Sequence, residues 1–362
     1  MEQLSFIESF RTSPFILTEG AIVERLRHEF HISPDKHIAH AALIYDDSHR
    51  EILASIYRQY LQIATEFRLP LMLMTPTRRA NIEQIATSDY RHKNVLADTM
   101  AFLSRFRDEA STPVYIGGLA GCRGNAYDGR YYLSVEEAME FHFPTVRTLA
   151  QSGADYLFAG IMPQLTEAIG MANAMAATGL PYIISFMICR DGRLIDGTFI
   201  HDAIDAIEKE TSTRPLCYMA NCVHPDVLHQ ALLHPRNDTP LVRQRFQGIQ
   251  ANAANLSPEE LDGCDHLISS SPEELADRLM TLLWDFPLKI CGGCCGTNQQ
   301  HMHRFAEMLA YRRDNKAWQL SAPVNGTARA GNANSHSFLL RFRYLRNNVG
   351  VKQKINWALL HL

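Results

Sequence analysis

The stretch Lys289-Ile-Cys-Gly-Gly-Cys-Cys-Gly-Thr297 places two adjacent cysteines, Cys294 and Cys295, on a glycine-rich turn directly after a short apolar run. A third cysteine, Cys222, closes another apolar run in Ala220-Asn-Cys-Val223. Because glycine lets the backbone turn tightly, adjacent cysteines in such a turn can bind one metal ion. Vicinal thiols between glycines have no evident packing role, so metal binding is the interpretation that we favour. A redox-active pair is the alternative, since a disulfide between neighbouring residues is strained.

Eight short apolar runs alternate with longer helical patterns, and the glycine-cysteine stretch follows the last of them. The runs are Phe15–Thr18, Leu69–Thr75, Val114–Leu119, Ala154–Ile161, Tyr182–Ile188, Leu216–Ala220, Phe246–Ala251 and Leu288–Cys291. Several are nearly continuous in apolar residues, which is typical of strands buried on both faces of a parallel sheet. The alternation predicts an α/β protein with a closed (β/α)8 TIM barrel. A doubly wound open sheet is the alternative.

Signals at helix ends support this alternation. Ser134-Val-Glu-Glu137 is a capping-box pattern that predicts the start of a helix. Gly179 predicts the end of the helix expected over Gln164–Thr178. Pro272, directly after Ser271, suits the first turn of another helix, where its missing N–H does no harm.

Composition narrows the class of protein. The chain has 362 residues, 46% of them hydrophobic and 20% charged, which is typical of a globular protein with a sizeable core. The net charge of -4 gives no reason to expect nucleic-acid binding. No apolar run approaches the roughly 20 residues of a membrane span. The N-terminus lacks a secretory signal pattern, so we expect a cytoplasmic protein whose eight cysteines stay reduced.

The C-terminal part differs from the rest, which suggests a boundary near residue 315. We expect residues 1–315 to form the barrel and residues 316–362 to form a linker and a basic extension. No acidic residue follows Asp314, and Pro323–Ser337 is rich in Gly, Ala, Asn and Ser. A loosely packed appendage or a contact in a homo-oligomer is the favoured interpretation of this extension. Binding to an anionic surface is the alternative.

The barrel prediction brings the three cysteines together. Cys222 closes the sixth predicted strand, and Cys294 and Cys295 follow the eighth. In a (β/α)8 barrel the carboxyl ends of all strands meet at one face, where active sites form. Three thiolates suit Zn²⁺ and leave its fourth tetrahedral position for a substrate. Asn221 could orient the Cys222 loop or make a local backbone hydrogen bond. His224 could support the site, but a lone histidine is more often a surface or capping residue.

Short motifs in order along the chain resemble the homocysteine S-methyltransferase family, which includes betaine–homocysteine and S-methylmethionine–homocysteine methyltransferases. The resemblance spans roughly residues 15 to 310. Its motifs are Thr18-Glu-Gly-Ala21, Leu133-Ser-Val-Glu-Glu-Ala138, Gly153-Ala-Asp155, Asp191-Gly192, Asp196-Gly-Thr198, Asn221-Cys222 and Gly292-Gly-Cys-Cys-Gly-Thr297. The last motif is highly specific, and the others are weak individually. The family fold is a (β/α)8 barrel.

The resemblance implies a site and a reaction. Cys222, Cys294 and Cys295 match the family's zinc ligands. Glu19, Gly20 and Asn252 match positions that bind substrate. The implied reaction moves a methyl group from a small donor to a zinc-activated thiol. That thiol would be homocysteine, giving methionine, or a related thiol. No catalytic residue beyond the metal site is assigned.

Departures from the family pattern affect the substrate pocket. Glu19 stands where the family has Asp, and Gly160 stands where it has a Glu that grips the substrate ammonium. Arg78 and Arg79 follow the second predicted strand, and we interpret them as the solvated start of a helix. The alternative is that they point into the barrel mouth, where they would disfavour a cationic donor and favour a carboxylate or phosphate. We therefore expect a divergent member whose acceptor could be a thiol other than an amino acid. A zinc-binding barrel without methyltransferase activity, acting as a binding or regulatory protein, is the alternative of a different class.

Overall fold

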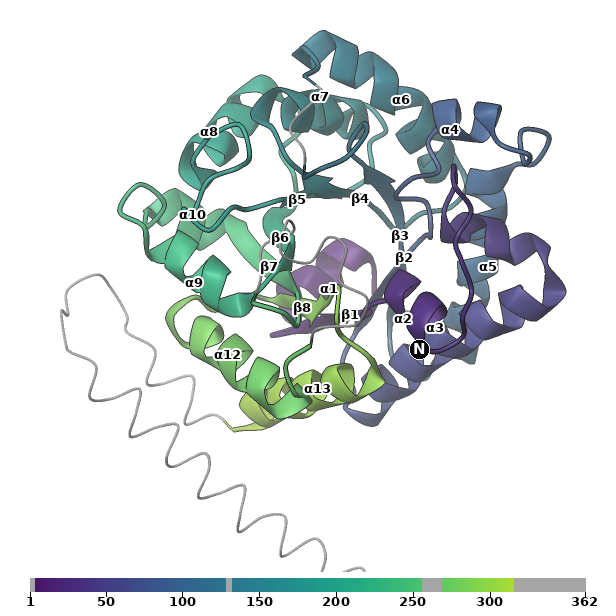
Figure 1. The fold of residues 1–362 in the computed structure, drawn as a ribbon. Helices are drawn as coiled ribbons and strands as arrows, with labels where there is room; N and C mark the ends of the chain where they lie inside the picture. Colours follow the sequence, from purple (N-terminus) through teal and green to yellow (C-terminus); the bar gives the residue numbers. More distant parts are fainter. Residues whose placement is uncertain (1–3, 128–131, 256–268, 316–362) are drawn as a thin grey trace, which may run out of the picture. The chain divides into compact units, whose positions relative to one another are not determined.

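Eight parallel strands close into a barrel in the computed structural model, which describes residues 4–127, 132–255 and 269–315. Each strand pairs with the next along the chain, and β1 pairs with β8. Figure 1 looks along the barrel and shows the helices arranged around the ring of strands. The predicted (β/α)8 fold is confirmed, and the open-sheet alternative was wrong because β1 and β8 meet.

The strands lie where apolar runs predicted them, with ends shifted by a few residues. They are β1 (Ile16–Thr18), β2 (Leu71–Met74), β3 (Val114–Gly121), β4 (Tyr156–Met162), β5 (Tyr182–Phe186), β6 (Cys217–Val223), β7 (Phe246–Ala251) and β8 (Ile290–Gly293). The helices of the outer ring follow them. In the described residues they include α2 (Val23–His28), the 3-10 helix η1 (His40–Tyr45), α3 (Asp47–Glu66), α4 (Ile82–Thr87), α5 (Val95–Glu109), α6 (Val135–Gln151), α7 (Leu165–Ala176), α8 (Ile200–Glu210), α9 (Pro225–Leu233), α10 (Pro240–Arg245), α12 (Pro272–Asp285) and α13 (Gln299–Asp314).

The residues that were predicted to begin or end helices do so in the structure. Ser134 and Glu137 form the capping box that begins α6. Ser271 caps α12, with Pro272 in the first turn. Gly179 follows α7 with a positive φ of 78°, a backbone conformation that favours glycine. These local signals place each helix so that its apolar face can cover the barrel.

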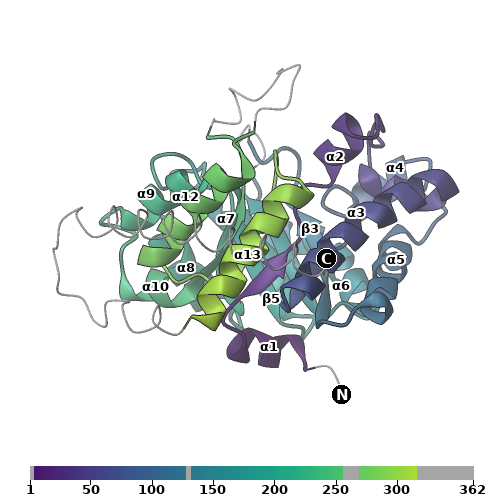
Figure 2. The ribbon, with the colours of Figure 1, turned by 90° about the horizontal axis from the view of Figure 1, so that it is seen from below.

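A short helix before the first strand closes one end of the barrel. In α1 (Phe6–Thr12), the ring of Phe6 stacks on Tyr156 with the ring centroids 4.4 Å apart. The Tyr115 hydroxyl donates to the backbone oxygen of Leu4 at 2.9 Å. Figure 2 shows α1 at one end of the barrel and α2 at the other. Since α1 covers the amino-terminal end, the carboxyl ends of the strands remain for the site.

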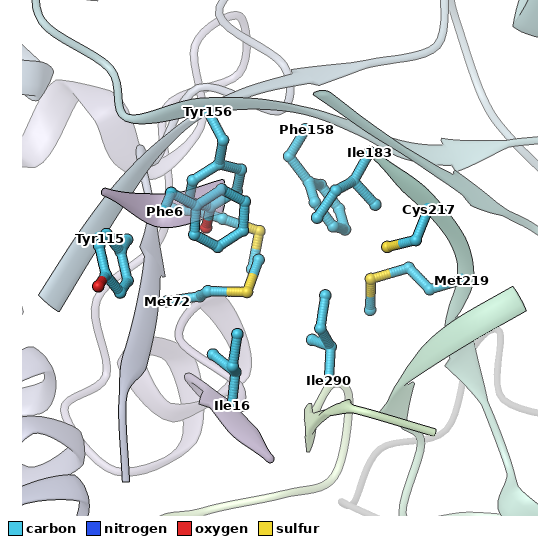
Figure 3. Close-up of a cluster of buried hydrophobic side chains, with 11 residues drawn as sticks. Phe6, Ile16, Met72, Tyr115, Tyr156, Phe158, Ile183, Cys217, Met219 and Ile290 are labelled. Carbon is cyan, nitrogen blue, oxygen red and sulfur yellow. The ribbon is translucent and has the colours of Figure 1, made fainter. Parts of the chain in front are cut away.

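The barrel interior is filled by large apolar side chains. Figure 3 shows the cluster, which takes residues from α1 and from most of the strands. It contains Phe6, Ile16, Met72, Met74, Tyr115, Tyr156, Phe158, Ile183, Cys217, Met219 and Ile290. Because side chains alternate along a strand, the next inward-facing layer toward the carboxyl ends is formed by Thr18, Leu119, Gly160, Ser185, Asn221, Gln250 and Gly292. This layer is the floor beneath the site.

One expectation concerns a part of the chain outside this description. The predicted linker and basic extension, 316–362, lie outside the described residues. Among the helices that are described, none has the length and apolar character needed to cross a membrane.

Candidate metal centre

The three predicted cysteines come together at the carboxyl ends of β6 and β8. The sulfur atoms of Cys222, Cys294 and Cys295 lie within 4.8 Å of one another. Each of the three residues is partly exposed. A tetrahedral zinc ion with zinc–sulfur distances of about 2.3 Å needs sulfur atoms roughly 3.8 Å apart. The three sulfurs therefore fit one zinc ion with small adjustments and keep a side open to a ligand.

The end of β6 turns sharply to present Cys222. The residue has a φ of 60°, which is uncommon without glycine, and the β6–β7 register shifts between Asn221 and Val223. The side-chain oxygen of Asn221 accepts hydrogen bonds from the Ile161 N–H at 3.0 Å and the Ser185 hydroxyl at 2.6 Å. Asn221 thus ties the Cys222 turn to β4 and β5, the positioning role expected for it.

The turn after β8 is held against the loop after β1. Thr297 accepts a hydrogen bond from the Ala21 N–H at 3.0 Å and donates one to the Cys294 carbonyl at 2.7 Å. Gly292 has no room for a side chain, since a Cβ there would lie 1.8 Å from the Thr18 hydroxyl oxygen. The glycine lets β8 pack tightly on β1. These contacts fix where Cys294 and Cys295 lie.

Hydrogen bonds among the sulfurs determine which one is ionised without a metal. Hydrogen bonds from the Cys294 and Cys295 thiols lower the pKa of Cys222 well below its usual range. The hydrogen bonds with Cys222 raise the pKa values of Cys294 and Cys295. In the metal-free cluster Cys222 is therefore the cysteine that loses its proton most easily. Since coordination removes a thiol proton, metal binding would release protons.

A side chain from another loop contacts the Cys222 sulfur. The Asn252 amide, directly after β7, donates to this sulfur at 3.8 Å, and its oxygen accepts from the Ala254 N–H at 2.9 Å. Burial raises the pKa of Tyr127, in the segment after β3, and the charges of Cys222, Cys295 and Cys294 raise it further. No spacing pattern in the sequence links Tyr127 to the cysteines.

Replacing Asn252 with alanine is expected to weaken metal binding about 10-fold or more, because partners of a ligand typically contribute 10- to 100-fold to metal affinity. The affinity would be measured by competition with a chromophoric chelator. Asn255→Ala is the matched control, since Asn255 is exposed and lies three residues further along the chain. Equal affinities for both variants and the unaltered chain would contradict a role for the Asn252–Cys222 contact.

Glu19 is buried beside this centre, at the end of β1. Its side chain is 7% exposed, and one carboxyl oxygen accepts from the Met74 N–H at 2.8 Å. Burial raises the pKa of Glu19 to about 8. The backbone oxygen of Glu19 also accepts from the Gly293 N–H at 3.2 Å, which links it to the cysteine turn. A buried carboxyl with a raised pKa would gain from a cationic group on a ligand.

Gly20 lies tightly packed next to Glu19. A Cβ on Gly20 would lie 2.9 Å from both the Met302 side chain and the Tyr60 hydroxyl. Because Gly20 has no side chain, α3 and α13 can pack closely against it. The predicted contact between Gly20 and the substrate stays a prediction, and only the backbone atoms of Gly20 could make it.

The space beside Gly160 is apolar. A Cβ on Gly160 would lie 2.9 Å from a terminal methyl of Leu119 and 3.6 Å from the Phe158 ring. Leu119 is partly exposed, so its side chain forms part of the floor. The atoms nearest to Gly160, from β3 and β4, are therefore carbon. A carboxylate would be needed there to hold the ammonium group of a substrate.

The remaining sequence candidates lie apart from the centre. Burial raises the pKa of both Cys217 and Cys291 to about 12, as expected for structural thiols. The His224 ring accepts from the Asp226 N–H and caps α9. Arg78 and Arg79 are exposed before α4, in agreement with a solvated start to that helix.

Comparison with known proteins agrees with this geometry. A sequence model of a family described as homocysteine S-methyltransferase matches residues 16–309. The homocysteine S-methyltransferase of Escherichia coli strain K12 is 28% identical over 178 residues, which are 48% of this chain and 54% of that protein. The homocysteine S-methyltransferase YbgG of Bacillus subtilis strain 168 is 34% identical over 76 residues, 21% of this chain and 24% of that protein. The chain thus matches about half, or less, of the length of these curated relatives.

Solved structures show the same fold. The metallated form of the homocysteine methyltransferase MmuM from Escherichia coli has a TM-score of 0.65 at 18% identity, covering 83% of this chain and 98% of that chain. Its apo form has a TM-score of 0.58 at 16% identity, covering 82% and 96%. At this identity the structural similarity supports the barrel.

Proposed function

Because the chain belongs to the homocysteine S-methyltransferase family, we propose that it is a zinc-dependent S-methyltransferase. It would move a methyl group from a small donor to an acceptor thiol. The observation that carries this proposal is the meeting of three cysteine sulfurs at the carboxyl ends of β6 and β8. Soft sulfur ligands favour zinc over harder divalent ions, and three protein ligands leave one position for the acceptor.

The residues of the centre have separable roles. Cys222, Cys294 and Cys295 would hold the ion, and Asn252 would orient the Cys222 sulfur through its amide. Bound zinc supplies Lewis-acid chemistry that keeps an acceptor thiol deprotonated at neutral pH. Three protein thiolates leave the centre negatively charged, which keeps an acceptor sulfur electron-rich. In one in-line displacement, the acceptor sulfur would form a bond to the methyl carbon as the bond from that carbon to the sulfonium sulfur or ammonium nitrogen of the donor breaks. The demethylated donor would leave with that electron pair, and the protein would supply position.

Glu19 favours an acceptor with an amino group. Its buried carboxyl lies at the end of β1 and is linked through Gly293 to the cysteine turn. An ammonium group there would offset the cost of burying the carboxylate. We therefore propose homocysteine or a related amino thiol as the acceptor, which would give methionine or its analogue. We propose the cytoplasm as the compartment, because thiols stay reduced there.

Leu119 and Gly160 favour a second acceptor class. The three heavy atoms nearest to a Cβ on Gly160 are carbons of Leu119 and Phe158, and carbon offers no charge to an ammonium placed there. A thiol without an amino group would lose less binding free energy there than homocysteine does, because it has no ammonium that needs a charged partner. A small non-amino-acid thiol is therefore the second candidate for the same reaction.

A panel of acceptors and donors tests both candidates. Purified zinc-loaded protein would be assayed with homocysteine, cysteine and 2-mercaptoethanol, each with S-methylmethionine, S-adenosylmethionine and betaine. We expect methylated product, with kcat/KM highest for homocysteine if Glu19 determines the choice. A higher value for 2-mercaptoethanol would favour the second candidate. No product from any pair, at one zinc per chain, would contradict the proposed reaction and favour a binding protein.

A further inference from the structure

His301 is a buried histidine in the first turn of α13, the helix that follows the cysteine turn (Figure 1). Its side chain is 4% exposed. The Nδ1 atom lies 3.3 Å from the Asn298 backbone nitrogen and 2.8 Å from the Asn298 side-chain oxygen, in the capping box that begins the helix. Capping uses Nδ1 alone. The other imidazole nitrogen, Nε2, is therefore available to a second segment of the chain.

Nε2 of His301 contacts the segment that leads into α12. It donates a hydrogen bond to the Ser270 carbonyl oxygen at 2.9 Å, since a carbonyl oxygen can only accept. Burial lowers the pKa of His301, which favours the neutral imidazole with one donor and one acceptor. One imidazole thus joins the backbone before α12 to the backbone before α13.

Backbone hydrogen bonds continue from Ser270 to the cysteine turn. The Ser270 N–H donates to the Ala253 carbonyl at 3.0 Å, and the Ala253 N–H donates to the Cys295 carbonyl at 2.9 Å. Cys295 lies three residues before Asn298, so these bonds and the intervening backbone close a hydrogen-bonded ring that begins and ends at His301. The ring therefore links the segments after β7 and β8 through a single side chain.

The hydrogen-bonded ring also fixes the backbone beside Asn252. Ala253 directly follows Asn252, whose amide donates to the Cys222 sulfur at 3.8 Å. Ala253 is fully buried, and packed interiors leave little room for movement. The place of Asn252 relative to Cys295 therefore depends on this ring, and the spacing of the Cys222 and Cys295 sulfurs depends on it in turn.

The residue after Cys295 is held from two sides. The Gly296 N–H donates to the Glu24 carboxyl group, and the Gly296 carbonyl accepts from the Ser269 hydroxyl at 2.9 Å. Gly296 has a φ of 78°, which favours glycine. Since Ser269 directly precedes the residue that His301 contacts, the imidazole also stabilises this second link to the cysteine turn.

We propose that His301 is a positioning residue of the metal centre: through Ser270 it fixes Asn252, which contacts the Cys222 sulfur, relative to the turn that carries Cys294 and Cys295. It would act through the backbone, so its loss changes the spacing of the three sulfurs and leaves all three in place. The proposal rests on the proposed function for the identity of the metal, and the hydrogen-bonded ring stands without it.

Cobalt-loaded full-length protein reports the spacing of the sulfurs. Co²⁺ held by thiolates in a tetrahedral site absorbs visible light strongly, and the absorption weakens when the geometry opens. We expect His301→Ala to bind Co²⁺ about 10-fold more weakly and with a weaker visible band, because residues that orient metal ligands contribute about 10- to 100-fold to affinity. His301→Gln should restore most of the affinity and of the band, since its amide nitrogen can donate to the Ser270 carbonyl.

His303→Ala is the matched control for these variants. His303 lies on the same helix, and its side chain is 47% exposed, so this variant should match the unaltered chain. Unchanged affinity and absorption in His301→Ala would overturn the proposal. Equal losses in His301→Ala and His301→Gln would overturn it as well, because the lost hydrogen bond would then not be the cause.

Hydrogen exchange in the metal-free protein separates this inference from the proposed function. We expect the Ala253 N–H to exchange about fivefold faster in His301→Ala than in the unaltered chain, because the ring that holds it is opened. The Leu157 N–H, which donates to the Pro181 carbonyl between β4 and β5, is the reference and should not change. Equal exchange at Ala253 would overturn the positioning role even in an active methyltransferase. Failure of the unaltered chain to bind Co²⁺ would contradict the proposed function and leave this test in force.

Discussion

Cys294→Ala is expected to lose the metal ion and methyl transfer together. Two sulfurs would remain, at Cys222 and Cys295, and two ligands hold zinc poorly against water and buffer. Loss of a partner of a ligand already costs about 10- to 100-fold in metal affinity, so loss of a ligand should cost more than about 100-fold. Metal content by mass spectrometry and product formation would be measured on the same samples.

Cys291→Ala is the control for this experiment. Cys291 lies in β8 three residues before Cys294, is fully buried and stands outside the cysteine cluster. The control should retain about one metal ion per chain and lose only some stability, because its small side chain leaves a small cavity. Activity that survives in Cys294→Ala would contradict the metal-based account. A comparable loss in Cys291→Ala would show that the effect arises from misfolding.

Glu19→Gln is expected to change both stability and substrate choice. Burial raises the folded-state pKa of Glu19 to about 8, from the 4.5 of an exposed carboxyl. A raised carboxyl pKa means that the stability present at low pH is lost as pH rises from about 4.5 to about 8. Glutamine cannot ionise and can keep the hydrogen bond from the Met74 N–H. The variant should therefore match the unaltered chain at pH 4.5 and exceed its stability at pH 8.5.

Urea unfolding of the metal-free protein at the two pH values measures this difference. One pKa unit corresponds to about 1.4 kcal/mol, so Glu19→Gln should be more stable by up to about 4 kcal/mol at pH 8.5. The exposed Glu140→Gln on α6 is the control and should show no difference between the two pH values. Parallel pH curves for Glu19→Gln and the unaltered chain would contradict a raised pKa.

The same variant separates the two acceptor classes. Without the carboxylate, KM for homocysteine should rise about 10-fold or more, because a hydrogen bond to a charged group contributes about 1.5–3 kcal/mol. KM for 2-mercaptoethanol should change little, since that thiol has no ammonium group. Equal effects on both acceptors would mean that Glu19 positions the cysteine turn and does not select the substrate.

The barrel could be predicted from the sequence because buried parallel strands leave a strong pattern. Runs such as Tyr182–Ile188 are largely apolar on both faces, so they are easily told from the helical segments, which have one polar face. The cysteine cluster was also predictable, since carboxyl ends of barrel strands converge wherever they lie in the sequence. The resemblance to a known family added the expectation of zinc and of a thiol methylation.

Other features of the centre depend on three-dimensional contacts without a sequence signature. The left-handed backbone of Cys222 depends on the turn after β6, where a non-glycine residue rarely adopts it. The departure at Gly160 was visible in the sequence, but the Leu119 methyl beside it was not.

X-ray absorption at the zinc edge tests the central claim most directly. Protein loaded with one zinc ion per chain would be measured alone and with the preferred acceptor thiol. The account predicts three sulfur neighbours at about 2.3 Å without acceptor and four with it. A zinc ion with fewer than three sulfur neighbours in the unaltered protein, or with three both before and after the thiol is added, would contradict the account.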